Sequence, residues 1–152
     1  MVFNASNANG LNIFDIQASD ASKNMQITGL GSSGTVIINV LGSSVSFGSH
    51  GYTNFDTARG RVLFNLPEAT TVNLSYVEGS ILAPQASITG NWGVVWGQVV
   101  TNNWSGPTQI NNAPFVGSLP VPAVPEPEAY AMLLAGLGLL RLVARRKDRA
   151  SA

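Results

Sequence analysis

The chain has 152 residues, enough for one domain of ordinary size, and it contains no cysteine, which excludes disulfides, thiolate metal sites and a cysteine nucleophile. Its formal charge of zero hides an asymmetry, because residues 1–120 contain three Lys and Arg against five Asp and Glu, a formal charge of −2. Such a body lacks the clustered cations that phosphate binding requires, so we expect no nucleic-acid partner.

Short β-strands are predicted along residues 1–118, which are rich in Gly, Ser, Asn and Thr and show no helical period. Apolar and polar residues alternate at 62–66 and 72–76, which places the apolar side chains on one face of a strand. β-branched or apolar runs bounded by turn residues predict the other strands, at 35–40, 44–47, 79–84, 86–89, 94–100 and 108–111. The sequence therefore predicts an all-β body.

The stretch from Gly79 to Asn103 favours a β-solenoid as the architecture of this body. Its short strands are separated by Gly, Pro or Asn, with no long hairpin loops, as in a chain that turns at the corners of successive coils. The sequence has no strict period, so a β-sandwich stays the alternative.

Three segments follow the body. Residues 119–128 contain four prolines and predict an extended linker, and residues 129–144 predict one transmembrane helix. A buried helix of a soluble domain is the alternative for the second segment. Residues 145–152 predict a basic cytoplasmic tail. By the positive-inside rule the β-rich body faces outward, membrane lipid is a partner, and the residues that set the topology are Arg141, Arg145, Arg146 and Lys147.

The order of a Pro-Glu-Pro motif, an apolar segment and a terminal Arg-Arg-Lys cluster resembles the PEP-CTERM sorting signal of Gram-negative bacteria. The resemblance implies that Pro125, Glu126 and Pro127 are recognised by an exosortase, an integral-membrane sorting enzyme. It also implies an exported protein that is held in the inner membrane as a precursor. Delivery to the cell surface or the extracellular matrix would follow, often together with exopolysaccharide.

The body is similar to the C-terminal half of the choice-of-anchor A domain, a surface module. The matching residues are Asn65-Leu66-Pro67, Gly79, Ile81-Leu82-Ala83-Pro84, Gly97-Gln98-Val99, Ile110-Asn111-Asn112 and Phe115. Some members of that family resemble collagen-binding adhesins, which implies an adhesive role. The N-terminal half of the family and its signal peptide have no counterpart here, so we expect the β-rich domain to be N-terminally incomplete.

No pattern of residues predicts catalysis. The one histidine, His50, lies in a glycine-flanked loop, and no second histidine is present to complete a metal site. The carboxylates of the body are scattered and lack the dense spacing of a calcium loop. We therefore expect no enzymatic activity, no catalytic residues, no metal and no cofactor.

Three tryptophans, Trp92, Trp96 and Trp104, fall within thirteen residues and are candidate carbohydrate-binding residues, because an exposed indole can stack on a sugar ring. Packing in the core or at a corner is the alternative, since large aromatic side chains bury much apolar area. Trp92 and Trp96 are four residues apart, so they would share a face of one regular strand.

These features favour an exported structural or adhesive protein of the cell surface or biofilm matrix, with exopolysaccharide or a surface protein as its ligand. The alternative is an anchored protein that binds or hydrolyses polysaccharide. A hydrolase would need a concave cleft in which carboxylates or a metal converge.

Overall fold

The computed structural model describes residues 1–120, 132, 136 and 137, and Met1–Leu119 form one compact unit. This body is built from strands, as predicted. They are β1 (Val2–Asn4), β2 (Leu11–Gln17), β3 (Met25–Thr28), β4 (Thr35–Leu41), β5 (Ser44–Phe47), β6 (Tyr52–Thr53), β7 (Val62–Asn65), β8 (Thr71–Glu78), β9 (Ser80–Trp96), β10 (Val99–Ser105) and β11 (Gln109–Asn111). Two short 3-10 turns, η1 (Ala18–Asp20) and η2 (Arg59–Arg61), lie between them.

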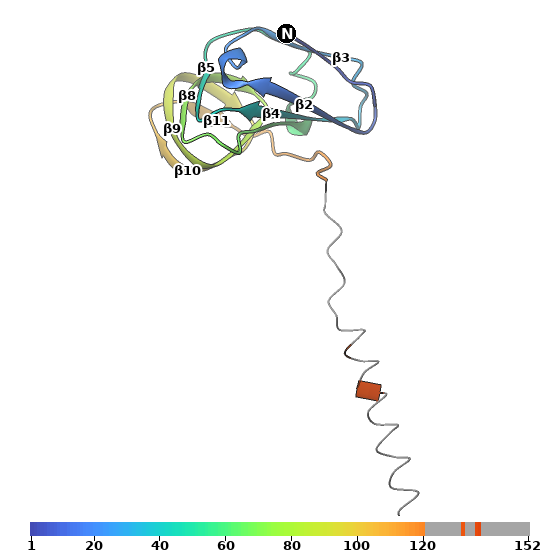
Figure 1. Ribbon diagram of the computed structural model, residues 1–152. Helices are drawn as coiled ribbons and strands as arrows, with labels where there is room; N and C mark the ends of the chain where they lie inside the picture. The colour runs from blue at the N-terminus through green and yellow to red at the C-terminus, as the bar shows by residue number, and fades with distance from the viewer. Residues whose placement is uncertain (121–131, 133–135, 138–152) are drawn as a thin grey trace, which may run out of the picture. The chain divides into compact units, whose positions relative to one another are not determined.

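Every strand pair among the described residues is parallel, so the chain winds in coils (Figure 1). The sheets have the strand orders β1-β3-β6 and β2-β4-β7-β9-β8-β5, and β10 and β11 also pair with β9. Leu11 lies beside Thr35, 24 residues later, whereas Ile81 lies beside Val99, only 18 residues later. The curled parallel sheet is solenoid-like, as predicted, and its later coils are shorter.

Strand β9 bends through one whole coil, so the strands with which its successive parts pair define the sides of the solenoid. Its residues 80–82 pair with β7, residues 87–90 with the first half of β8, and residues 94–96 with the second half of β8. The sequence predicts separate strands for this stretch. The structure joins residues 80–96 into one strand, because a solenoid corner can bend the chain without breaking its ladder of hydrogen bonds.

We name two sides of the solenoid by their strands. The β4 face consists of β2, β4, β7 and the start of β9, continued by the start of β10. The β5 face consists of β5, residues 71–74, residues 87–90 and residues 103–105. A third side comprises the sheet β1-β3-β6 in the first coils and residues 76–78, residues 94–96 and β11 in the later ones.

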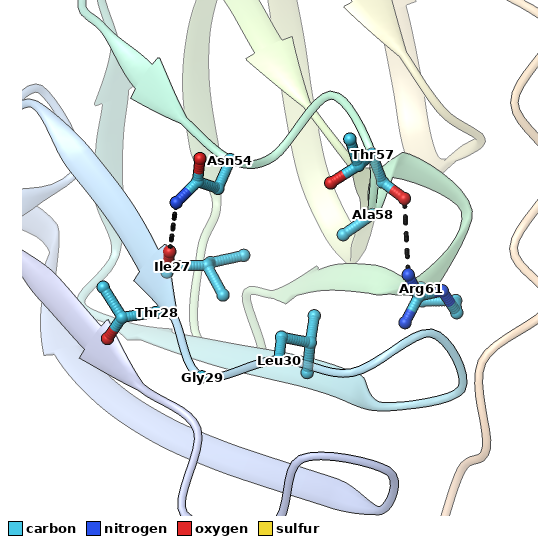
Figure 2. Close-up of a pocket in the computed structure, with 8 residues that line it drawn as sticks. All are labelled: Ile27, Thr28, Gly29, Leu30, Asn54, Thr57, Ala58 and Arg61. Carbon is cyan, nitrogen blue, oxygen red and sulfur yellow. Dashed lines mark hydrogen bonds between the residues drawn. The ribbon is translucent and has the colours of Figure 1, made fainter.

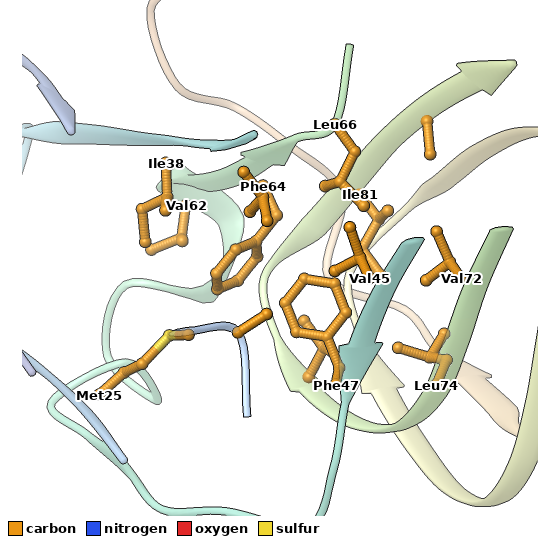
Figure 3. Close-up of a cluster of buried hydrophobic side chains, with 14 of the residues drawn as sticks. Met25, Ile38, Val45, Phe47, Val62, Phe64, Leu66, Val72, Leu74 and Ile81 are labelled. Atoms are coloured by element: carbon orange, nitrogen blue, oxygen red, sulfur yellow. The ribbon is translucent and has the colours of Figure 1, made fainter. Parts of the chain in front are cut away.

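The hydrophobic core fills the space between these sides (Figure 3). Strand β5 shows how the sequence builds it, because Val45 and Phe47 point inward and are 1% exposed, while Ser44 and Ser46 alternate with them on the outside. The ring of Phe47 meets the ring of Phe64 at 5.3 Å in an edge-on arrangement. The largest fully buried side chains include Phe47, Phe55, Phe64, Met25, Ile27, Ile38, Leu66, Leu74, Ile81 and Ile88.

Residues 113–119 form a strap that folds back onto earlier coils. The backbone N–H of Ser118 donates to Oγ1 of Thr35 at 2.9 Å, although 83 residues separate them. The backbone N–H of Val116 donates to the carbonyl oxygen of Gly60 at 2.7 Å. The strap therefore ties the end of the body to β4 and to the turn before β7.

Apolar side chains are also buried on the outer side of the β4 face, where the strap bonds to the side chain of Thr35. Ile37 and Leu63 are only 6% and 8% exposed, yet they lie outside the central core cluster. Their neighbours Val36, Ile38 and Val62 belong to that cluster, so Ile37 and Leu63 point the opposite way. Strand β4 consequently lacks a clear alternation of exposed and buried residues, since both of its sides are covered.

The predicted linker, transmembrane helix and basic tail fall on residues 119–152, most of which lie outside the described residues. These assignments stay predictions, as do the domain boundaries based on them. Among the residues that the structure does describe, no helix is long and apolar enough to cross a membrane.

Candidate functional site: a polar grid on the β5 face

The β5 face presents two rows of exposed, uncharged polar side chains. In parallel register, one row is Ser44, Thr71, Ser87 and Asn103, and the other is Ser46, Asn73, Thr89 and Ser105. Neighbouring strands lie about 4.8 Å apart and alternate residues about 6.8 Å apart, so these side chains form a regular array about 15 Å wide. We call these eight residues the polar grid.

Most side chains of the polar grid have no partner in the protein. The hydroxyl of Ser105 donates to the carbonyl oxygen of Ile88 at 3.3 Å. Within the described residues, the other seven side chains make no hydrogen bond. Serine and threonine hydroxyls and asparagine amides can each both donate and accept. The face thus offers both hydrogen-bond donors and hydrogen-bond acceptors. None of its strand segments contains a charged residue.

Trp92 stands beside the polar grid and is 86% exposed. The register between β8 and β9 shifts after Leu74, so residues 91–93 oppose Ser75 alone. This β-bulge is tight, because a Cβ atom at Gly93 would clash with the carbonyl oxygen of Ser75. Bulges re-aim side chains, and this one directs the indole into solvent three residues after Thr89 of the grid.

The structure does not bring the three tryptophans into one row. The guanidinium carbon of Arg59 lies 4.1 Å from the ring centroid of Trp96, which is half-buried. Trp104 lies beside Ile88 in the register and packs, half-buried, against the core. Of the three candidate carbohydrate-binding residues only Trp92 offers a free aromatic face, and the role itself stays a prediction.

An ion pair between Arg59 and Glu78 lies on the third side of the solenoid. Glu78 is 4% exposed and accepts hydrogen bonds from Nη2 of Arg59 at 3.0 Å, from Nε of Arg59 and from the hydroxyl of Tyr76. The bond to Glu78 raises the pKa of Arg59, whereas burial, followed by the bond to Glu78, raises the pKa of Tyr76. Because every partner is directed at one carboxylate, this cluster fixes the turn η2 against β8.

His50 is a packed loop residue. Its Nδ1 atom lies 3.0 Å from the carbonyl oxygen of Gly48, and its ring lies 4.5 Å from the ring of Tyr52. Burial lowers the pKa of His50. Its Nε2 atom is buried without a hydrogen-bond partner in the described part of the chain. The imidazole packs against Tyr52 at an interplanar angle of 39°, and burial disfavours its charged form.

Like Glu78, the carboxylates of Asp15 and Asp20 are each engaged in a contact of their own. On the β4 face, Nδ2 of Asn39 donates to Asp15 at 2.7 Å, and Nδ2 of Asn65 donates to Oδ1 of Asn39 at 2.8 Å. Asp20 pairs with Lys23 at 2.6 Å. Within residues 1–120 and the three described positions beyond, no group of three His, Cys, Asp or Glu side chains could hold a metal ion.

A cavity of about 190 Å³ lies between the end of β3 and the loop that precedes η2 (Figure 2). It is lined by Ile27, Thr28, Gly29, Leu30, Asn54, Thr57, Ala58 and Arg61. The guanidinium of Arg61 donates to the carbonyl oxygens of Gly31 at 2.9 Å and Thr57 at 3.3 Å. Nδ2 of Asn54 donates to the carbonyl oxygen of Ile27 at 2.9 Å. The cavity is smaller than the roughly 300–1,000 Å³ of ordinary ligand pockets, and these polar groups hold loops together.

The predicted sorting and topology residues lie outside the described residues. They are Pro125, Glu126, Pro127, Arg141, Arg145, Arg146 and Lys147. Their individual roles therefore stay predictions.

Comparison with known families assigns both parts of the sequence. A family model described as "Putative Ice-binding-like adhesive domain" matches residues 1–112. A second model, described as a PEP-CTERM protein-sorting motif, matches residues 123–147, which confirms that predicted resemblance. The resemblance to the choice-of-anchor A domain is not confirmed. Neither the comparison with curated proteins nor that with solved structures gave a match.

Proposed function

The chain belongs to the ice-binding-like adhesive family, as the match over residues 1–112 shows, and from this premise we propose that it is an exported adhesive protein of the cell surface or matrix. The observation that carries the proposal is the order of parts in one chain. An adhesive-type body is followed directly by a sorting motif at residues 123–147.

The sorting motif supports the exported part of the proposal. A PEP-CTERM signal implies processing by an exosortase and a precursor stage that is anchored in the membrane through the C-terminal segment. We propose that the mature body then acts at the outer surface or in the surrounding matrix. There it would contact exopolysaccharide or a surface protein.

A binding role is favoured over a catalytic one by the arrangement of the polar groups. The described carboxylates that make close contacts do so in separate pairs or ladders, with Asn39, Lys23 and Arg59. Hydrolysis of a glycosidic bond would need two carboxylates about 5–9 Å apart across a substrate. The exposed polar grid, in contrast, suits reversible contacts with an extended ligand.

Fractionation of cells tests the sorting step. The full-length chain is expressed in a Gram-negative host that contains an exosortase, and Pro125-Glu126-Pro127 are replaced by alanines. A matched control replaces Pro120 and Pro122, which lie in the same proline-rich stretch but outside the motif. We expect the control to reach the surface or medium and the motif variant to accumulate in the inner membrane.

Attachment of the same cells to abiotic and polysaccharide-coated surfaces tests the adhesive step. Cells with the control variant should attach more strongly than cells without the gene, and cells with the motif variant should not. Equal sorting of both variants would contradict the role of the motif. Normal delivery without any gain in attachment would contradict the adhesive function.

A further inference from the structure

We propose that the polar grid, together with Trp92, is the ligand-binding surface of the body and that its ligand is an uncharged polysaccharide. The inference rests on the proposed adhesive function and gives it a site and a ligand class.

The β5 face is the side of the solenoid on which the structure leaves regularly spaced polar groups open. On the β4 face Ile37 and Leu63 are buried and the strap bonds to Thr35, and the amides of Asn39 and Asn65 are engaged in a ladder that ends on Asp15. On the third side, Arg59 and Glu78 tie down a turn. Seven of the eight grid side chains keep their hydrogen-bonding groups for a ligand, as far as the described residues extend.

The charge of the surface selects the class of polysaccharide. The grid contains only hydroxyl and amide side chains, and residues 1–120 have a formal charge of −2. An anionic glycan would be repelled by this body and would find no cation on the face to pair with. The hydroxyls of a neutral glycan both donate and accept hydrogen bonds, which matches the capacity of Ser, Thr and Asn.

Trp92 distinguishes a sugar from a lattice of water as the ligand. A pyranose ring has an apolar face that can stack on an indole, whereas ordered water gains nothing from one. The indole is 86% exposed and is held out by a tight bulge, an arrangement that leaves a large apolar group in water unless something covers it. Trp92 lies at the corner that follows Thr89 of the grid, so a group for stacking and groups for hydrogen bonding are close together along β9.

Affinity electrophoresis of the full chain in detergent micelles tests the inference. The gels contain hydroxyethyl cellulose or dextran as neutral probes, or alginate as an anionic one. Two site variants are compared with wild type: Trp92→Ala, and the double variant Asn73→Lys with Thr89→Lys at the centre of the grid. The matched control, Gln17→Lys with Thr53→Lys, adds the same charge at exposed positions on the other two sides. Circular dichroism verifies that all variants are folded.

We expect at least one neutral glycan, but not alginate, to retard wild type and control alike. Trp92→Ala should weaken the apparent affinity about tenfold, the effect of losing one good stacking contact, and the double variant should abolish retardation. No retardation by either neutral glycan, or equal retardation of all folded variants, would overturn the inference. If wild type instead partitions into growing ice and the double variant does not, the face binds ordered water and the glycan assignment is wrong. Attachment by normally sorted cells in the absence of glycan binding would leave the proposed function standing without this ligand.

Discussion

Replacing Arg59 by methionine should destabilise the body more than replacing its partner Glu78 by glutamine. The side chain of Glu78 is 5% exposed and that of Arg59 is 28% exposed. Without Arg59, a buried carboxylate keeps, among the residues that the structure describes, only the hydroxyl of Tyr76 as a partner. Without the charge on Glu78, the guanidinium can still reach water and still lies over Trp96. The two substitutions should therefore lower the free energy of unfolding by different amounts.

The magnitudes follow from this asymmetry. Removing one partner of a buried ion pair costs about 3–5 kcal/mol, and the partial access of water favours the lower end, about 3 kcal/mol for Arg59→Met. Weakening hydrogen bonds to a charged group costs about 1.5 kcal/mol, which we expect for Glu78→Gln. The double variant should be more stable than Arg59→Met alone, because it no longer buries an unpaired charge.

Urea unfolding of the full chain in detergent micelles, followed by tryptophan fluorescence, measures these differences. With a slope of about 2 kcal/mol per molar urea, a loss of 3 kcal/mol lowers the midpoint by about 1.5 M. Trp96 lies under Arg59, so one of the three tryptophans that contribute to the emission is part of the site. A midpoint for Arg59→Met at or above that of Glu78→Gln would refute the reasoning, as would a double variant less stable than both single variants.

Three further predictions concern the body. Phe64 is fully buried in the aromatic core, so Phe64→Ala should lower the free energy of unfolding by about 3–5 kcal/mol in the same urea titration. The control Val100→Ala, at a position 53% exposed, should change it by less than about 0.5 kcal/mol. Gly106→Ala should lower the midpoint of thermal unfolding, because φ is +102° there and a Cβ atom would clash with the carbonyl oxygen of Gly90 in the neighbouring coil. The control Gly48→Ala, at a position with open space around it, should leave the midpoint unchanged. Burial lowers the pKa of His50 from its ordinary value of 6.5, so the unfolded state takes up the proton first and stability should fall as the pH decreases below about 7. His50→Gln should flatten this pH dependence, and an unchanged slope would contradict it.

Sequence patterns predicted several of the strands whose two sides differ, although β2 (Leu11–Gln17) was missed. At residues 44–47 and 71–74 one side meets the core and the other meets water, so apolar and polar residues alternate. The strand predicted at 35–40 from its β-branched residues is β4, but the strap that bonds to it was not predicted, because the contact between Ser118 and Thr35 spans 83 residues. Strands β1, β3 and β6 have two to four residues each, too few for a period to show.

The candidate site was predictable only in part. The cluster of tryptophans directed attention to residues 92–104, and Trp92 is indeed exposed there. Its separation from Trp96 depends on the bulge opposite Ser75, which is a property of register between strands rather than of local sequence. The polar grid was missed for the same reason. Its members on neighbouring strands lie 16–27 residues apart along the chain and become a surface only when the coils stack.

The strap also determines how the body would respond to being pulled from its C-terminal end. Tension that enters along the chain from Pro120 reaches the bond between Ser118 and Thr35 before it reaches any strand ladder. Those few bonds would break one after another and free seven residues, which span at most about 24 Å when fully extended, while the coils and the β5 face keep their shape. Such a segment would extend under load before the folded body is strained, and it could bind again to the body when the force is removed.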